Sequence, residues 1–272
     1  MRCIERILHL NPIIKKSKSM KIRVTSTSNF ILFLKKLKVV DRSVLLELTE
    51  TDLFCKVHTP DKSVMKFSRI PTNLIFDSLT EFSALKCDRI KIGLLDITRL
   101  MDSFRYFRSE EEVFLHLEIA TIDDECVATE LKLISPSLKI RIKCADLSLL
   151  SYVEDSISDL VQSQEDALAS FKFFVSDFSS VSSLCGMESN SEELLNFSLH
   201  SDYVRVIGES FDYKLTIGSS DIDCAKPLDA SIYKSHLNYV DPESCICFFH
   251  ENRIVFASDQ TPTSTAIGII EK

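Results

Sequence analysis

The sequence predicts an α+β protein made of two similar halves, and three observations lead to this prediction. A short alternating strand followed by an amphipathic helix occurs four times, and each copy is followed by three short strand-like runs. An acidic, serine-rich stretch separates the second copy from the third. Each half therefore holds two βαβββ units. The chain has 272 residues and 45% hydrophobic content, which is enough for one large core or two ordinary ones.

The first unit begins with residues 20–40, MKIRVTSTSNFILFLKKLKVV. Ser28 or Thr27 is the expected N-cap of its helix, and the helix is expected to bury one face and expose its lysines. The expected buried face consists of Phe30, Phe33, Leu34 and Leu37. The three strands expected to follow are Val44–Leu48, Leu53–His58 and Val64–Ile70.

The second unit repeats this order from residue 90. A strand at Ile90–Leu94 leads to Asp96, the expected N-cap of a helix that buries Ile97, Leu100, Met101 and Phe104. The strands expected after this helix are Val113–Ile119, Val127–Ile134 and Leu138–Cys144. The last strand alternates most clearly, because Ile140 and Ile142 lie between basic residues.

The second half repeats the pattern with a serine-rich helix that packs Phe178, Val181 and Cys185, and with a short fourth helix ending near Leu237. The expected strands are Leu194–His200, Tyr203–Gly208, Phe211–Ile217, Asp229–Tyr233, Cys245–His250, Arg253–Ser258 and Thr265–Ile270. We therefore expect one domain at 20–146, a linker at 147–168 and a second domain at 169–272. Residues 1–19 are expected outside the fold, either as a basic arm or because the true start is Met20.

Charge and composition exclude several functions. The net charge is −8, yet residues 1–42 hold eleven Lys and Arg against two acidic residues, so the remainder is strongly acidic. The five glycines form no phosphate-binding loop, and the histidines and acidic clusters show no metal-site or catalytic spacing. We therefore expect neither an enzyme nor a cofactor nor a metal site. Nine cysteines without a C-x-x-C pair indicate reduced thiols, and the apolar runs are too short to span a membrane.

The four βαβββ units in two linked halves resemble a DNA sliding clamp, specifically the two-domain trimeric type of PCNA and of tailed phages. The opening MKIRVTSTSNFILFLKKL and the closing TSTAIGIIEK have the character of the phage type. The resemblance covers Met20–Glu271 and implies two clamp domains with helices inside and antiparallel sheets outside. It further implies a homotrimeric ring around double-stranded DNA, a partner DNA polymerase and an ATP-dependent clamp loader. The expected location is the cytoplasm, that of the host for a phage, or the nucleus for a eukaryote.

The resemblance also implies three groups of site residues. A clamp holds DNA through mobile Lys and Arg on its inner helices without reading bases, although for any single residue a solvated helix face is the alternative. The DNA-binding candidates are Lys35, Lys36, Lys38, Arg42, Arg99, Arg105, Arg108 and Lys234. Edge strands pair between subunits, and the residues assigned there are Lys139, Arg141, Lys143, Tyr213 and Leu215. Partner peptides bind beneath the linker, and the residues assigned there are Leu147, Leu149, Tyr152, Ile267 and Ile269.

Three other interpretations stay open at the level of the sequence. In the first, the chain is one subunit of a heteromeric clamp. In the second, it is a β-rich viral adaptor or structural protein whose repeats are coincidental. In the third, it is a nuclease with unrecognised carboxylate ligands. A clamp predicts a ring-forming trimer that slides off linear DNA at the free ends. An adaptor predicts no dependence on DNA topology, and an enzyme predicts metal-dependent turnover. The lysine-, phenylalanine- and serine-rich composition is typical of an AT-rich genome.

Overall fold

The computed structural model of the protein describes residues 15–77, 79, 82–107, 112–122, 124–150, 167–187, 193–221, 228–258 and 263–270. Its first half contains β1 (Lys15–Val24), α1 (Thr27–Lys38), β2 (Val44–Leu48), β3 (Asp52–His58), β4 (Val64–Pro71), β5 (Ile90–Leu94), α2 (Ile97–Ser103), β6 (Val113–Ile122), β7 (Glu125–Ile134) and β8 (Lys139–Lys143). Its second half contains β9 (Ala169–Phe173), α4 (Val175–Met187), β10 (Leu194–Leu199), β11 (Tyr203–Ile207), β12 (Asp212–Asp221), β13 (Leu228–Tyr233), β14 (Ile246–Phe249), β15 (Arg253–Ala257) and β16 (Thr263–Gly268). Short 3₁₀ helices are η1 (Thr72–Leu74), η2 (Ser83–Leu85), η3 (Phe104–Tyr106), η4 (Leu147–Leu149) and η6 (Lys234–Tyr239).

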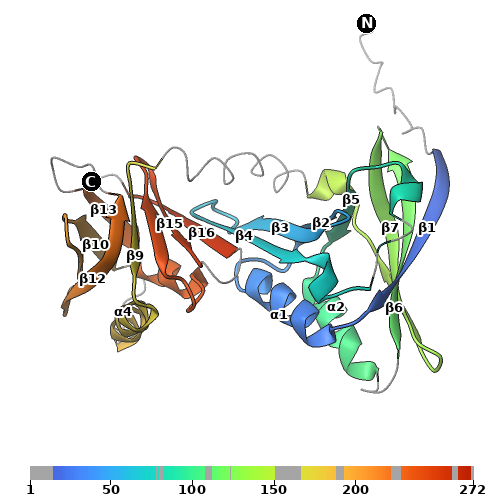
Figure 1. Ribbon diagram of the computed structural model, residues 1–272, viewed down its shortest axis with the longest axis horizontal. Helices are drawn as coiled ribbons and strands as arrows, with labels where there is room; N and C mark the ends of the chain where they lie inside the picture. The colour runs from blue at the N-terminus through green and yellow to red at the C-terminus, as the bar shows by residue number, and fades with distance from the viewer. Residues whose placement is uncertain are drawn as a thin grey trace, which may run out of the picture.

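The predicted α+β architecture of two similar halves is confirmed. All the strands belong to one continuous sheet. In it the first half contains the series β5-β2-β3-β4 and β1-β6-β7-β8, and the second half repeats them as β13-β10-β11-β12 and β9-β14-β15-β16, with β12 also paired to β9. Nearly all neighbours are antiparallel, while a short parallel contact joins β5 to β7. Figure 1 shows α1, α2 and α4 on the same side of the sheets.

The two halves meet through one antiparallel strand pair. β4 of the first half pairs with β16 of the second, from Val64 opposite Ile267 to Ser68 opposite Thr263. The sheet therefore continues without a break from one half to the other, as Figure 1 shows at the centre of the molecule. Each half has its own hydrophobic core on the helix side of its sheets.

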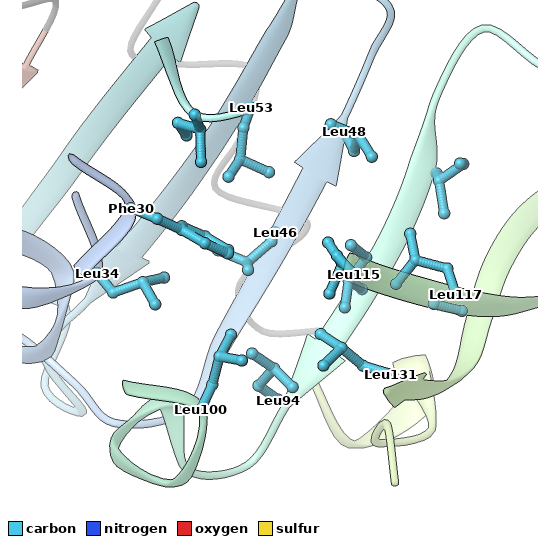
Figure 2. Close-up of a cluster of buried hydrophobic side chains, with 14 of the residues drawn as sticks. Phe30, Leu34, Leu46, Leu48, Leu53, Leu94, Leu100, Leu115, Leu117 and Leu131 are labelled. Carbon is cyan, nitrogen blue, oxygen red and sulfur yellow. The ribbon is translucent and has the colours of Figure 1, made fainter. Parts of the chain in front are cut away.

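The core of the first half confirms the predicted helix faces. Phe30, Phe33, Leu34 and Leu37 are all buried on α1, and Phe30 contacts Phe104 edge-on with 5.5 Å between ring centroids. Leu46, Leu48 and Leu94 of the adjoining strands point into the same cluster (Figure 2). Asp96 caps α2 as predicted, because its side chain accepts from the Thr98 amide. The cap of α1 was predicted wrongly, since Ser26 rather than Ser28 or Thr27 accepts from the Asn29 amide.

Two other boundaries differ from the prediction. β1 begins at Lys15 rather than Met20, so residues 15–19 belong to the sheet; β6 is long enough to pair with them, and Lys18 Nζ donates to the Leu85 carbonyl at 2.6 Å. The fourth helix is the 3₁₀ helix η6. The limits of the extension, the two domains and the linker stay a prediction, because residues 1–14 and 151–166 lie outside the described part.

Candidate nucleic-acid interface

Five of the predicted DNA-binding residues are accessible on the helix side of the first half. Lys35 and Lys38 project from α1, Arg42 follows it, and Arg99 and Arg105 project from α2 and η3. The Ile97 amide donates to the Arg42 carbonyl at 2.8 Å, which holds the end of α1 beside the start of α2. The helices therefore bring these cations onto one surface.

The cations of this surface also act on the α2 cap. Hydrogen bonding from Thr98 is the main cause that lowers the pKa of Asp96, and the positive charges of Arg42 and Lys38 lower it further. The Arg105 side chain is 77% exposed, and its guanidinium lies 3.3 Å from the Asp102 carboxylate. These side chains are mobile surface cations rather than a rigid site, which suits attraction to phosphate without base recognition.

Two other predicted DNA-binding residues, Lys36 and Lys234, do not join this surface. Lys36 is 15% exposed and lies 3.4 Å from Glu243 and 3.7 Å from Asp241, so its charge is directed into an ion cluster. Lys234 is buried and its ammonium lies 3.4 Å from the Glu193 carboxylate. Arg108 lies outside the described residues. Position on a helix indicated Lys36 and Lys234, whereas the carboxylates that oppose them come from distant parts of the chain.

The corresponding surface of the second half is uncharged by comparison. α4 carries no Lys or Arg, and its exposed face is built from serines. Ser180 and Ser183 donate to the carbonyls of Ser176 and Ser179, at 3.0 and 2.8 Å. Their hydroxyl donors are therefore partly used within the helix. The positive charge of the helix side is concentrated in the first half.

The residues assigned to subunit contact lie on strands with available backbone edges. β8 pairs with β7 alone among the described strands. Hydrogen bonds join Cys144 to Thr129 and Ser135 to Leu138, and the alternation between them directs the backbone N–H and C=O groups of Lys139, Arg141 and Lys143 away from β7. All three side chains are exposed.

The second assigned strand, β12, bonds to β11 through Asp212–Thr216 and to β9 only from Ile217 onward. The amide of Gly208 donates to the Phe211 carbonyl at the start of this ladder, so Lys214 and Thr216 direct their backbone groups away from β11. Tyr213 is half-buried and Leu215 is buried in the second core. A contact at this edge would therefore use backbone groups, and Leu215 would anchor the strand to the second core.

The residues assigned to partner peptides do not form one site. Leu147 and Leu149 line a cavity of about 1130 Å³ with Leu94, Ile142 and neighbouring residues of the first half. Ile267 is fully buried on β16, and Ile269 packs against the second core, so the strands β2, β3 and β4 separate them from this cavity. Tyr152 lies outside the described residues. In the described part these residues do not line one cavity, and their assignment to partner peptides stays a prediction.

A different apolar strip at the junction was missed by the sequence analysis. Met65 and Phe67 alternate with Lys66 on β4 and therefore lie on the face opposite the helices. There they contact Phe248, Val255 and Ala266 of the second half, and both side chains stay partly accessible. Apolar residues on both faces of β4 were the available signal in the sequence.

Comparison with solved structures finds the same chain topology in sliding clamps. PCNA from Thermococcus kodakaraensis aligns over 93% of this chain and 100% of its own with a TM-score of 0.63 at 10% identity. PCNA from Entamoeba histolytica aligns over 93% and 99% with a TM-score of 0.61 at 11% identity. A. fulgidus PCNA, in a structure with the C-terminal region of FEN-1, aligns over 93% and 99% with a TM-score of 0.65 at 13% identity. No family model and no curated protein matches the sequence.

The fold is therefore that of the DNA sliding clamps, and in particular that of the two-domain chains of PCNA. The alignment includes nearly all of each PCNA chain, so both halves participate in the likeness. Within the described ranges, His, Cys, Asp and Glu form no group of three or more that could hold a metal ion. The helices in those ranges are also too short or too polar to cross a membrane.

Proposed function

We propose that this chain is the subunit of a homotrimeric DNA sliding clamp that encircles duplex DNA and tethers a replicative DNA polymerase. The observation that carries the proposal is the junction between the halves. β4 is the last strand of the first unit of its half and β16 is the last strand of the second unit of the other half. The strands in the two complementary positions are β12 and β8, which both have available backbone groups.

Two copies can therefore repeat between them the pairing that each copy makes within itself. Such a head-to-tail contact is heterologous, and it closes into a ring when the rotation per copy divides a full turn. Pairing would also remove two strand edges that otherwise invite aggregation. The likeness to PCNA over both halves supports three copies, and the helices would then line the inside of the ring.

Lys35, Lys38, Arg42, Arg99 and Arg105 would face the DNA from this inner wall. Their exposed, mobile charges attract phosphate at every position along the duplex, as sliding requires. The serine face of α4 would contribute hydrogen-bond donors with little charge. We further propose that the partly accessible side chains of the apolar strip, Met65, Phe67 and Phe248, bind apolar peptides of the polymerase and of the ATP-dependent loader, with Val255 and Ala266 buried beneath them. The FEN-1 region bound to A. fulgidus PCNA supports a peptide partner of this kind.

The ring is tested by a backbone variant of β8. Arg141→Pro removes an outward-facing N–H without breaking a bond to β7, while Arg141→Ala removes the same side chain and keeps the N–H. We expect wild-type protein and R141A to be trimeric in analytical ultracentrifugation, and R141P to be shifted toward monomer. Equal mass for R141P and R141A would contradict pairing through this edge, and a wild-type monomer at micromolar concentration would contradict the ring.

Sliding is tested by retention on DNA after loading by the cognate loader. We expect the protein to stay on circular DNA and to be lost when the circle is linearised. The double variant Lys35→Glu/Arg105→Glu should shorten retention on the circle while leaving the trimer intact. Equal retention on circular and linear DNA would favour an adaptor over a clamp, and a requirement for a second, related chain would favour a heteromeric ring.

A further inference from the structure

A row of basic residues crosses the outer sheet of the first half. In the register of β1, β6, β7 and β8, Lys21 lies opposite His116, His116 opposite Lys132, and Lys132 opposite Arg141. The four residues therefore form one line across four strands, on the face opposite the first core. We call Lys21, His116, Lys132 and Arg141 the basic row. The helix side of the molecule contributes nothing to it.

The rows on either side add further positive charge. Arg23 and Lys139 stand at the ends of one neighbouring row, and Lys143 stands at the end of the other. This face holds six Lys and Arg against the carboxylates of Glu112, Glu118 and Glu130, in a chain whose net charge is −8. The Lys and Arg of this face are Lys21, Arg23, Lys132, Lys139, Arg141 and Lys143.

Lys132 and Arg141 are the one pair of permanent cations directly opposite each other in this row, and like charges in such positions repel. Lys132 offsets part of this repulsion through Glu118 at 2.6 Å and Glu130 at 3.0 Å. Burial is the main cause that lowers the pKa of His116, and Lys132, Lys139 and Lys21 lower it further against the effect of Glu118. Glu118 and Glu130 in turn raise the pKa of Lys132, so the uncompensated positive charge of this face lies on its exposed cations rather than at Lys132.

The same face also offers rings for stacking. Phe114 lies next to His116 on β6 with one residue between them, and its ring is partly exposed. The Lys21 ammonium lies 4.0 Å from the Phe114 ring centroid. An aromatic ring on an inner strand of a four-stranded sheet, with cations around it, is an arrangement that binds unpaired bases and their phosphates.

We propose that this outer face binds single-stranded DNA, with the exposed cations Lys21, Lys139, Arg141 and Lys143 on the phosphates and Phe114 against a base. Lys132 is 11% exposed and held by Glu118 and Glu130, so it supports the row without contacting the phosphates. Along β8, Lys139, Arg141 and Lys143 are spaced by about 6.8 Å, twice the rise of a strand, and can contact successive phosphates of an extended chain. Edge pairing of β8 in a ring uses backbone groups, so the side chains of this face stay accessible. The inference goes beyond the proposed clamp function and concerns a surface outside the ring channel.

The charge reversal Lys21→Glu/Arg141→Glu tests the proposal with fluorescein-labelled oligo(dT) of about 20 nucleotides in an anisotropy titration. We expect the double variant to bind at least about tenfold more weakly and its salt dependence to fall by about two phosphate contacts. Phe114→Leu should weaken binding about fivefold or more through loss of stacking. Lys21→Glu removes the cation–π contact with Phe114, whereas Arg141→Glu places a carboxylate opposite Lys132, so the melting temperature of each variant is measured and binding is compared below it.

The matched control reverses two cations on the helix side, Lys35→Glu/Arg105→Glu. It should leave oligo(dT) binding within about twofold while it shortens retention on circular duplex DNA, which separates this surface from the channel. Unchanged oligo(dT) affinity in K21E/R141E would overturn the proposal, as would an equal loss in the helix-side control. Tighter binding of poly-glutamate than of oligo(dT) would also overturn it, in favour of an acidic protein partner.

Discussion

The junction between the halves contains a buried ion pair, and its removal should lower the free energy of unfolding. The Lys66 ammonium, on a side chain 2% exposed, donates to Asp241 Oδ1 at 2.6 Å and to the Tyr239 carbonyl at 2.9 Å. Asp241 is 9% exposed, and Lys36 lies 3.7 Å from its second oxygen. The two partners come from β4 and from the segment after η6, so the pair links the halves directly.

The variants Asp241→Asn and Lys66→Met should differ in their cost. Asp241→Asn removes the negative charge and leaves a buried ammonium with neutral oxygen acceptors such as the Tyr239 carbonyl, and breaking a buried pair in this way costs about 3–5 kcal/mol. Lys66→Met leaves the Asp241 carboxylate next to Lys36 and removes a charge that burial already disfavours, so it should cost less. Burial is the main cause that lowers the pKa of Lys66, against the opposing effect of Asp241.

The free energy of unfolding is measured by equilibrium unfolding in urea, and the melting temperature of each variant is measured separately. A loss of about 3–5 kcal/mol should lower the melting temperature by about 10 °C in a chain of this size. Lys66→Met/Asp241→Asn should be less destabilised than the sum of the single variants, because neither charge is left alone. Additive losses, or a larger loss for K66M than for D241N, would refute this account of the pair.

The sign of the pH dependence follows from the lowered pKa of Lys66. The unfolded chain binds more protons than the folded chain between the folded pKa and the ordinary value of 10.5, so stability rises with pH across that window. The stability of the wild type relative to K66M should therefore increase as the pH approaches 10.5. A difference that shrinks in this window would contradict the direction of the shift.

Three further predictions concern single positions in the first half. Ser26→Ala removes the cap that accepts from the Asn29 amide at 3.2 Å and should cost about 1 kcal/mol in urea unfolding, whereas Ser28→Ala should cost much less. Gly93→Ala places a methyl group 2.8 Å from Leu150 Cδ1 and 3.0 Å from the Ala145 carbonyl oxygen. It should therefore lower the free energy of unfolding by about 1–3 kcal/mol and increase hydrogen exchange at residues 145–150. Unchanged exchange would contradict the contact. Hydrogen bonding from Thr59 is the main cause that lowers the pKa of Asp61 to about 2. The stability of the wild type relative to Asp61→Asn should therefore be fully present above about pH 4 and be lost as the pH falls through about 2. The measurement is the difference in melting temperature between the two proteins.

The elements that local chemistry defines were predicted from the sequence. The alternation of Ile22 and Val24 and the helical spacing of Phe30, Phe33, Leu34 and Leu37 follow from the geometry of one strand and one helix, and the structure confirms them. The Asp96 cap was found for the same reason. Ser26 was missed because three consecutive Ser or Thr residues can each cap a helix that begins nearby.

The tertiary structure decided which side chains meet across long stretches of chain. Lys36 and Lys234 are as basic as Lys35, yet Asp241, Glu243 and Glu193 arrive from other elements and remove them from the exposed surface. The basic row depends on the register of four strands, a relation that no local pattern contains.

The pairing of β4 with β16 also depends on the tertiary structure, because the two strands lie about two hundred residues apart in the chain. The sequence alone determined the repeated units, the Asp96 cap and the apolar helix faces, because each depends on residues a few positions apart. The junction, the ion pair within it and the outer charge pattern required the fold, because side-chain contacts between distant segments depend on how the sheets assemble.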